Sequence, residues 1–416
     1  MVNKDAHIRV LYSFPHKLGG GRIQTTAWEQ VRGITQAGAE VLVCPGFLQV
    51  ALPGNPVVKP TLSRGRLRLP YKLLGTARTC LLHDRIVARR LRKLAGKIDI
   101  VHLWPLAASQ TARTAAEMGI PTVLERPNAH TAFAYQVVQD ECQRLGIALP
   151  PGHEHAFDRG KLVREEEEYQ LTDYLLCPSD FVMKTFVDRG FPHRKLVRHS
   201  YGMDPQTFYP SPSRLHDTGK LFTMIFVGVC AVRKGLHFAL EAWLKSPASR
   251  TGQFLIAGEF IPSYEEKLRP WLAHESIRLL GHRDDVAELM RNSDVLVLPT
   301  LEEGSALVTS EARASGCVLL VSEASGAICR HGENALEHRV GDVETLARHI
   351  TQLYEDPALL HKLRANSLST VDEITWTAAG VKLLDLYREV IASYRAARSS
   401  TAVSEPAVSC NHVSVS

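Results

Sequence analysis

The sequence predicts an α/β protein made of two doubly wound domains. Short apolar runs of strand length alternate with stretches of helical length, and Gly or Pro residues separate them, as is typical of parallel α/β units. This alternation occurs twice along the chain. A segment rich in turn-forming residues, from Tyr209 to Gly219, divides the two halves. We therefore expect two Rossmann-like domains.

The composition is that of an ordinary globular protein. The chain has 416 residues, of which 45% are hydrophobic and 22% charged, which excludes disordered, collagen-like and coiled-coil classes. No apolar run reaches the roughly 18 residues that span a bilayer. The first residues contain no apolar signal segment, so we expect a cytoplasmic protein. The eight cysteines are scattered without a metal-binding or disulfide pattern.

The first half begins with a strand, a Gly-rich turn and a helix that Gly38 ends. Strands are expected at Ile8–Ser13, Val41–Cys44, Ile98–Leu103, Pro121–Leu124, Tyr174–Cys177 and Lys195–His199. Helices are expected at Thr25–Gln36, Ser109–Met118, Thr131–Leu145 and Ser179–Asp188.

The second half repeats the alternation and ends in a long helix that Thr375 would cap. Strands are expected at Leu221–Val227, Phe254–Ala257, Ile277–Leu280, Val295–Leu298 and Val318–Val321. Helices are expected at Leu236–Leu244, Asp284–Asn292 and Val308–Ala314. We expect a first domain over residues 1–205, a linker over 206–219, a second domain over 220–372, a final helix over 373–398 and a disordered tail over 399–416.

Two acids and a glycine follow the strand expected at 295–298. Glu303 and Gly304 lie in the loop after this strand, and Glu311 follows in the next helix. Ligands of open α/β sheets bind beyond the carboxyl ends of the strands. We expect the N–H groups at the start of this helix to form a cradle for a diphosphate. By helix rise the two acids are at most about 12 Å apart, so they can hold hydroxyls at opposite ends of such a ligand. From the periodicity alone, it is equally good to interpret both acids as solvated surface residues.

Adjacent cations follow the strand expected at 221–227. Gly228 begins a loop that carries Arg233 and Lys234 just before the next helix. A lysine in the first turn of a helix is unfavourably placed in the helix dipole unless an anion binds nearby. A phosphate would supply that charge. A solvated Arg–Lys pair is the alternative, but the parallel position of the two loops in one domain favours the phosphate.

These residues resemble a known family. Glu303 and Glu311 with seven residues between them, the Lys234–Gly235 loop and the runs 279–286 and 312–316 are similar to the nucleotide-sugar half of the retaining glycosyltransferase family 4 (group 1) enzymes. In the first half, Gly19, Gly20 and Gly21 fit the acceptor-side Gly loop of the family. The run from Glu125 to His130 fits its loop with a functional histidine.

The resemblance implies a GT-B fold, in which two Rossmann-like domains face each other across a cleft and the last helix crosses back to the first domain. It implies a retaining hexosyltransferase that uses a nucleotide diphosphate sugar as donor and an acceptor hydroxyl, in polysaccharide or glycoconjugate biosynthesis. His130 and Glu303 would be the catalytic residues beside the donor sugar. Lys234 would bind the diphosphate and Glu311 the ribose. The donor-binding residues would be Gly228, Arg233, Lys234, His282, Arg283, Gly304, Ser305, Ala306, Leu307 and Glu311.

One position departs from the family. Val229 stands where many members carry an Arg, and we expect Arg233 to replace that cation. His102, His153 and His155 are the competitors of His130.

Transfer without a metal or cofactor is expected. A lysine and a helix N-terminus would stabilise the charge that develops on a leaving diphosphate, and no Asp-x-Asp loop lies beside these strands. The Gly19–Gly21 turn does not complete a dinucleotide fingerprint, because Gln24 stands at the third glycine position. A nicotinamide enzyme is therefore disfavoured. The run Glu165–Glu168 is interpreted as a solvated helix face.

The net charge of +5 conceals a basic segment. Lys59 to Lys97 contain twelve Lys or Arg and one acid, Asp84, a local charge of +11 that leaves −6 for the rest. Leucines accompany these cations, so we expect the segment to dock on an anionic membrane surface, where a glycan or lipid-linked acceptor would be presented; a small-molecule acceptor is the other option. A solvated helix face is an equally good interpretation. Nucleic acid is disfavoured, since Tyr71 is the only aromatic residue among the cations.

Two alternative functions fit the same motifs. A nucleotide-sugar epimerase or hydrolase would lack a separate acceptor, and a non-catalytic protein would bind a sugar nucleotide without turnover.

Overall fold

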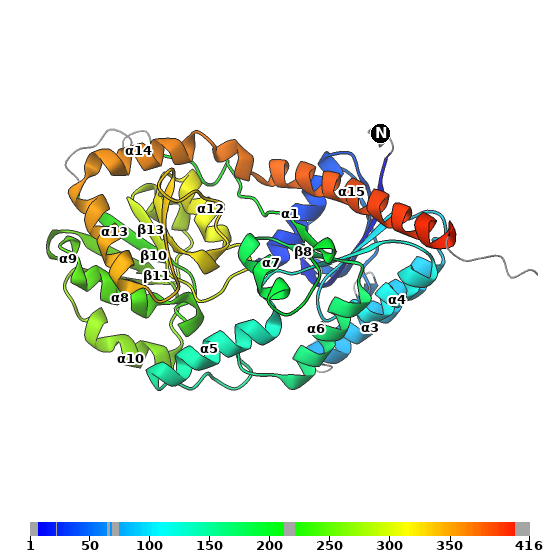
Figure 1. The fold of residues 1–416 in the computed structure, drawn as a ribbon, viewed down its shortest axis with the longest axis horizontal. Helices are drawn as coiled ribbons and strands as arrows, with labels where there is room; N and C mark the ends of the chain where they lie inside the picture. The colour runs from blue at the N-terminus through cyan, green and yellow to red at the C-terminus, as the bar shows by residue number, and fades with distance from the viewer. Residues whose placement is uncertain (1–6, 22, 65–66, 69–74, 212–220, 404–416) are drawn as a thin grey trace, which may run out of the picture.

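The computed structural model describes residues 7–21, 23–64, 67–68, 75–211 and 221–403 of the chain. Within these residues the chain forms two parallel β-sheets, one before and one after residue 212, with helices around each (Figure 1). A short antiparallel pair, β4 (Ser63–Arg64) and β5 (Leu67–Arg68), forms a separate two-stranded sheet. We call residues 7–211 the first half and residues 221–374 the second half. The predicted α/β class is confirmed.

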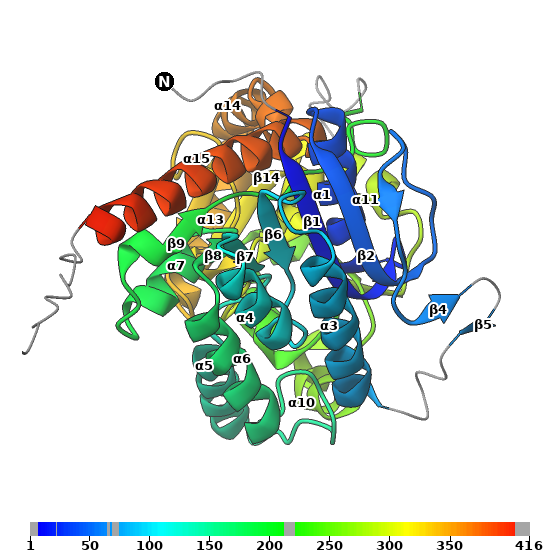
Figure 2. The same cartoon turned by 90° about the vertical axis from the view of Figure 1, so that its right-hand side faces the viewer.

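The first sheet has the order β3-β2-β1-β6-β7-β8-β9 and all its pairings are parallel. Figure 2 shows it with its flanking helices. Its strands are β1 (Arg9–Leu18), β2 (Glu40–Leu48), β3 (Val57–Val58), β6 (Ile100–Leu103), β7 (Thr122–Glu125), β8 (Tyr174–Cys177) and β9 (Leu196–Arg198). Its helices are α1 (Ile23–Gln36), α3 (Thr76–Arg92), α4 (Ser109–Glu117), α5 (Thr131–Leu145), α6 (Arg159–Leu171) and α7 (Asp180–Val187), with a 3-10 turn η1 (His193–Lys195).

Successive residues of β1 point to opposite faces of this sheet, as strand geometry requires. Val10 and Tyr12 pack in a cluster with residues of α1 and the C-terminal helix. Leu11 packs on the other face with residues of α3 and α4. Helices cover both faces, and this explains why the strands read as continuous apolar runs in the sequence.

The second sheet has the order β12-β11-β10-β13-β14-β15 and is also parallel. Its strands are β10 (Thr223–Val227), β11 (Gln253–Ala257), β12 (Ile277–Gly281), β13 (Val295–Leu298), β14 (Val318–Ser322) and β15 (Ala335–His338). Its helices are α8 (Leu236–Lys245), α9 (Ala248–Thr251), α10 (Pro262–Leu272), α11 (Val286–Arg291), α12 (Leu307–Ala314), α13 (Val343–Glu355) and α14 (Pro357–Leu368), with 3-10 turns η2 (Val232–Lys234), η3 (Glu323–Ser325) and η4 (Val371–Ile374).

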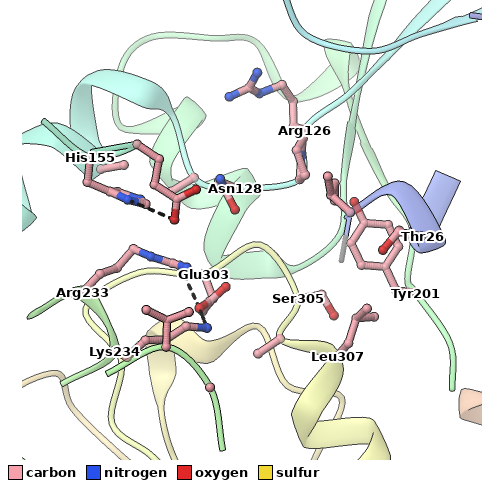
Figure 3. Close-up of a pocket in the computed structure, with 18 of the residues that line it drawn as sticks. Thr26, Arg126, Asn128, His155, Tyr201, Arg233, Lys234, Glu303, Ser305 and Leu307 are labelled. Atoms are coloured by element: carbon pink, nitrogen blue, oxygen red, sulfur yellow. Dashed lines mark hydrogen bonds and ion pairs between the residues drawn. The ribbon is translucent and has the colours of Figure 1, made fainter. Parts of the chain in front are cut away.

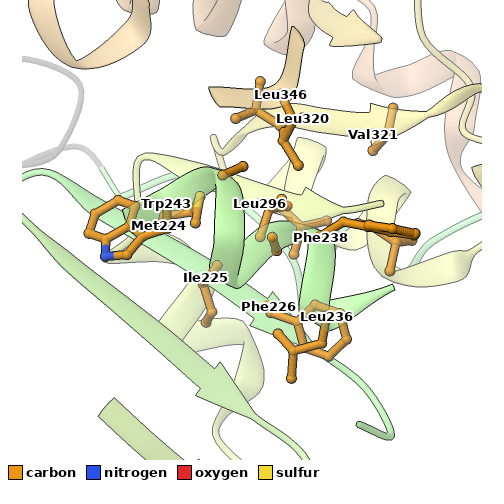
Figure 4. Packing of buried hydrophobic residues seen from close by; sticks show 14 of the residues in the cluster. Met224, Ile225, Phe226, Leu236, Phe238, Trp243, Leu296, Leu320, Val321 and Leu346 are labelled. Atoms are coloured by element: carbon orange, nitrogen blue, oxygen red, sulfur yellow. The ribbon is translucent and has the colours of Figure 1, made fainter. Parts of the chain in front are cut away.

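The core of the second half forms around β10 and α8 (Figure 4). Phe226, Leu236 and Trp243 are fully buried there. The indole N–H of Trp243 donates to Ser276 Oγ at 2.9 Å, so this large side chain is buried without an unpaired donor. Each such aromatic or aliphatic side chain contributes about 1.5–3 kcal/mol by leaving water.

The C-terminal helix α15 (Trp376–Val403) crosses back to the first half, as predicted (Figure 1). It packs on α1 at a contact between Gly33 and Gly380, where a Cβ on Gly33 would lie 2.9 Å from the Gly380 Cα. Its start is fixed to the first half by the Trp376 N–H, which donates to the Met203 carbonyl at 3.2 Å. The helix continues to Val403, whereas the sequence predicted an end at 398 and a disordered tail from 399; this part of the prediction is wrong for 399–403.

A second connection joins the halves through α5. Val138, Cys142 and Leu145 of this helix belong to the hydrophobic cluster of the second half. Beside them, the Glu141 carboxylate accepts a hydrogen bond from His237 Nε2 of α8 at 2.7 Å. The halves are therefore held together on two sides, by α15 and by α5.

The predicted strands and helices are found with shifts of a few residues. The sequence analysis named no element at the helices α10, α13 and α14 or at the strand β15, although α13 has 13 residues. Predictions for residues 69–74, 212–219 and 404–416 lie outside the described residues. The domain boundaries themselves stay predictions. None of the described helices is long and apolar enough to cross a bilayer.

Candidate functional site

A cavity of about 750 Å³ lies between the two halves, beyond the carboxyl ends of both sheets (Figure 3). Residues of β1 and α1 and the loops that follow β6 and β7 line it from the first half, and loops that follow β10 and β13 line it from the second half. This is where open α/β sheets bind their ligands. Seven of the predicted donor-side residues line the cavity: Gly228, Arg233, Lys234, Ser305, Ala306, Leu307 and Glu311. Glu303 lines it as well.

Glu303 lies between two cations (Figure 3). Its Oε1 is 2.7 Å from Arg233 Nη1 and also contacts Lys234 Nζ. Burial alone would raise the pKa of Glu303, but the two cations hold it below its usual range. The carboxylate is therefore ionised at neutral pH. Both cations have an anionic partner that an incoming phosphate can replace.

The loop that carries these cations depends on Gly235. Its φ is +67°, and a Cβ there would lie 2.0 Å from the Pro299 carbonyl oxygen. The η2 turn therefore packs directly on the end of β13, which brings Arg233 and Lys234 next to Glu303. The Arg233 carbonyl accepts from the Leu301 N–H at 2.8 Å and keeps the two loops in register.

Glu311 lies one turn into α12 and lines the cavity. Among the described residues its carboxylate has no hydrogen bond or ion pair, and burial raises its pKa to about 7. It is an unpaired acceptor at the opposite end of the motif from Glu303. The predicted N–H cradle is only partly available, because the Ala306 N–H donates to the Ser325 carbonyl at 3.1 Å.

Gly304 has a different role from the predicted one. It does not line the cavity; a Cβ there would lie 1.8 Å from the Pro127 carbonyl oxygen of the first half. The glycine thus lets the loop after β13 touch the loop after β7. This contact closes one side of the cavity.

The loop of His130 is placed as expected, but the His130 side chain does not line the cavity, so its catalytic role stays a prediction. Arg126, Asn128 and Ala129 line the cavity, whereas His130 does not. Its Nδ1 accepts a hydrogen bond from the Ala132 N–H at 3.2 Å and caps α5. The ring packs edge-on against Tyr169 and Phe186. Burial, together with Arg126 and Arg189, lowers its pKa to about 3.

Two of the competing histidines face the cavity instead. His153 and His155 line it, in the loop between α5 and α6. His155 Nε2 is 3.1 Å from Glu302 Oε1 of the second half. The sequence analysis did not identify Glu302, because the motif uses only the neighbouring acid, Glu303. Nothing in the sequence indicated that this loop reaches across the cleft.

The remaining predicted site residues lie outside the cavity lining. His282 is exposed and lies 3.5 Å from Asp284, and Arg283 is exposed and pairs with Asp285 at 2.5 Å. The nearby Val286 does line the cavity.

The predicted acceptor-side loop also lies outside the cavity lining. Gly19, Gly20 and Gly21 form the turn before α1, and two residues of α1 itself, Ile23 and Thr26, reach the cavity. These loops frame the site without contributing the predicted contacts.

The acidic run of α6 is only half solvated, so that prediction is corrected. Glu165 and Glu168 are buried, at 4% and 1% exposure. The Glu168 carboxylate accepts N–H groups of Leu106 and Ala108 at 2.7 and 2.9 Å, and burial raises its pKa to about 8. Glu165 lines the cavity and pairs with Arg126 at 3.4 Å. The two buried acids of α6 therefore hold the loops that follow β6 and β7.

The first-half wall also contains aromatic side chains that the sequence did not single out. Phe14 and Trp104 pack edge-to-face with centroids 5.0 Å apart, and Tyr201 lies beside Thr26 and Leu307 (Figure 3). The Tyr201 hydroxyl donates to buried Glu125 at 2.9 Å. Aromatic faces of this kind suit the apolar faces of sugar rings.

This arrangement is that of a GT-B glycosyltransferase: two facing α/β sheets, a cavity between them, and a basic loop beside a paired-acid motif. The profile of the family described as Glycosyl transferases group 1 matches residues 222–356. The second half is therefore similar to this family, as the resemblance implied. The finer assignment to family 4 stays a prediction.

Curated relatives agree with this class. The chain is 29% identical over 119 residues to a D-inositol 3-phosphate glycosyltransferase of Streptomyces bingchenggensis, and this alignment covers 28% of this chain and 26% of that protein. It is 23% identical to a D-inositol 3-phosphate glycosyltransferase of Thermobispora bispora over 87% of this chain and 88% of that protein. The alignment with the first of these spans about a quarter of the relative's length.

Solved structures confirm the fold. A sucrose-phosphate synthase from Thermosynechococcus elongatus superposes with a TM-score of 0.65 at 17% identity, over 93% of this chain and 100% of that one. Anabaena HepE in complex with UDP and glucose superposes with a TM-score of 0.61 at 15% identity, over 91% and 99%. The GT-B fold is thereby confirmed.

Proposed function

We propose that the protein is a retaining glycosyltransferase that moves a hexosyl group from a nucleotide diphosphate sugar to an acceptor hydroxyl, in polysaccharide or glycoconjugate biosynthesis. The observation that carries the proposal is the position of Glu303 between Arg233 and Lys234 at the carboxyl ends of β10 and β13. The group 1 family match and the relatives' names support the class.

The second-half wall fits the donor. Arg233 and Lys234 are placed to accept the diphosphate in exchange for their contact with Glu303, and the start of α12 adds its dipole. Glu311 is an unpaired acceptor for ribose hydroxyls. UDP is a reasonable first nucleotide to test, since HepE was solved in complex with it.

The chemistry follows from these charges. The bond from the sugar C1 to the diphosphate oxygen breaks, the acceptor oxygen bonds to C1, and the acceptor proton passes to the leaving phosphate. Positive charge develops on the sugar ring and negative charge on the leaving group. Glu303 faces the first, and Arg233 and Lys234 stabilise the second in place of a metal. Retention at C1 comes from the resemblance to the family.

The first-half wall fits the acceptor. Phe14, Trp104 and Tyr201 offer aromatic faces, and Asn128 and Thr26 offer hydrogen bonds. Such a mixed, nearly neutral wall suits a polyol, whether the acceptor is a glycan, a lipid-linked sugar or a small molecule.

Product analysis tests the proposal. Purified protein is incubated with UDP-, GDP- and ADP-hexoses, with and without a mixture of simple glycoside acceptors, and nucleotide diphosphate release is measured. Release that depends on acceptor supports transfer. Release to water alone would indicate a hydrolase, a changed sugar without release an epimerase, and binding without turnover a sugar-nucleotide-binding protein. Each of these three results contradicts the proposal.

We further propose that α3 docks the first half on an anionic membrane surface. Arg78, Arg85, Arg89 and Lys93 are exposed on or just after this helix, while Asp84 is buried and bonded to the start of α4. The one acid of the basic segment thus does not offset its exposed cations. Arg66 and Lys72 lie outside the described residues. The protein should sediment with phosphatidylglycerol vesicles at low salt and be released by high salt; no sedimentation at low salt would contradict docking.

A further inference from the structure

Glu302 precedes the motif acid Glu303 but lies behind the cavity wall. It is fully buried and does not line the cavity. Its Oε1 accepts hydrogen bonds from His155 Nε2 at 3.1 Å and from Arg233 Nη1 at 3.3 Å. Both partners do line the cavity, and they come from opposite halves.

Arg233 is fixed by these contacts along one edge. Its Nη1 contacts the Glu302 carboxylate, the Glu302 carbonyl at 3.0 Å and the Glu303 carboxylate at 2.7 Å. Among the described residues its Nε and Nη2 make no hydrogen bond. One edge of the guanidinium is therefore held by the protein, and the other remains for an anionic ligand.

His155 belongs to a segment that is held by the second half at more than one point. Within residues 146–158, Ile147 and Leu149 pack against the hydrophobic cluster of the second half. The Ala148 carbonyl accepts from Ser263 Oγ of α10 at 3.3 Å. The His155–Glu302 contact is the hydrogen bond that fixes the part of the segment lining the cavity.

We propose that Glu302 is a positioning residue, which, together with His155, holds Arg233 and the 146–158 segment in the arrangement that receives the donor diphosphate. This rests on the proposed function. Arg233 contacts both Glu302 and Glu303, and Glu303 stands inside the cavity. Glu302 is the carboxylate partner that Arg233 keeps when a ligand replaces Glu303. Without Glu302 the guanidinium would no longer be fixed on ligand binding, and binding would weaken.

The sign of the effect distinguishes positioning from simple charge. Removing a negative charge beside a phosphate site would tighten the binding of an anion if charge alone mattered. If Glu302 positions Arg233, its removal loosens binding. Glu302→Gln keeps the shape and removes the charge, so it separates the two effects.

Glu141→Gln is the matched control. Glu141 also accepts from a histidine across the halves, His237 at 2.7 Å, and from an arginine, Arg144 at 2.9 Å, but it lies outside the cavity. Both variants therefore lose a carboxylate with the same kinds of partner across the same interface.

The test is calorimetric binding of UDP, GDP and ADP to the full chain, with hydrogen exchange of residues 146–158 in the ligand-free protein. For the nucleotide that the wild type binds, we expect about tenfold weaker binding in Glu302→Gln, the scale of one charge-assisted hydrogen bond. We expect the Glu141→Gln value within about twofold of wild type, since it makes no contact with the site. Equal or tighter binding in Glu302→Gln would overturn the proposal.

His155 provides a second pair of variants if Glu302→Gln does not fold. His155→Leu removes the donor to Glu302, whereas His155→Gln keeps an N–H at a similar reach. Faster exchange over 146–158 in His155→Leu, restored in His155→Gln, is expected. Exchange unchanged in His155→Leu would contradict the positioning role. A wild type that binds none of the three nucleotides would instead overturn the proposed function, and this inference with it.

Discussion

The two walls of the cavity balance their charges in different ways. On the second-half wall, Arg233 and Lys234 contact an acid that itself lines the cavity, so their partner can be exchanged for a ligand. On the first-half wall, Arg126 pairs with Glu165, which also lines the cavity, but the Arg126 side chain is buried and stacks on Tyr169, so it is held within its own half. One wall is therefore prepared for an anion, and the other for a neutral, ring-shaped molecule.

Removing the cations of the second-half wall should have the largest effect. We expect Lys234→Ala to lower the turnover number at least about hundredfold, because a preorganised group that stabilises leaving charge is lost. Initial rates with the active donor measure this. Lys245→Ala, an exposed lysine of α8 paired with Glu241 and Glu344, is the control and should leave the rate unchanged. Equal rates in Lys234→Ala and the control would remove the distinction between the walls.

Glu303→Gln should lower turnover by a smaller factor, about tenfold to hundredfold. The amide keeps the shape but no longer offers a charge to the developing positive centre, while the cations lose a partner. The turnover number and KM for the donor should be measured separately. Glu323→Gln, at an exposed position of η3, is the control. A Glu303→Gln protein with full turnover would exclude Glu303 from the chemistry.

The unpaired Glu311 predicts a pH-dependent stability. Burial raises its pKa to about 7 from an ordinary value near 4.5, so the folded state holds the proton more tightly than the unfolded chain. The resulting stabilisation is present below the unfolded pKa and is lost as the pH rises through 7. Between about pH 5 and pH 8, the free energy of unfolding of the wild type should fall by about 1–3 kcal/mol relative to Glu311→Gln. Denaturant titrations at the two pH values measure it; a difference that stays constant with pH would contradict the raised pKa.

His130, which lies behind the first-half wall, should matter least for turnover. Because His130 caps α5, His130→Asn should keep the cap and most of the stability, while His130→Ala should lower the free energy of unfolding by about 1–2 kcal/mol. Both should retain turnover within a few fold. A large loss of turnover in the stable Asn variant would restore the catalytic role that the sequence suggested.

The contrast between the walls also explains what the sequence could predict. The second-half site was predictable because Glu303, Lys234 and Glu311 follow strands at fixed spacings, and strand ends meet at one edge of a sheet. The first-half site was harder, since the direction of a side chain such as His130 depends on helix capping and aromatic packing. The His155–Glu302 contact was not predictable, because it joins residues 147 positions apart across the two halves.

The most direct test of the central claim, that the second-half wall binds a diphosphate, compares nucleoside diphosphate with monophosphate of the same base by calorimetry. We expect the diphosphate to bind at least about tenfold more tightly to the wild type, because Arg233 and Lys234 gain charge-assisted contacts with the second phosphate. The preference should disappear in the Arg233→Ala, Lys234→Ala double variant. Equal affinities for the two nucleotides in the wild type would contradict the account.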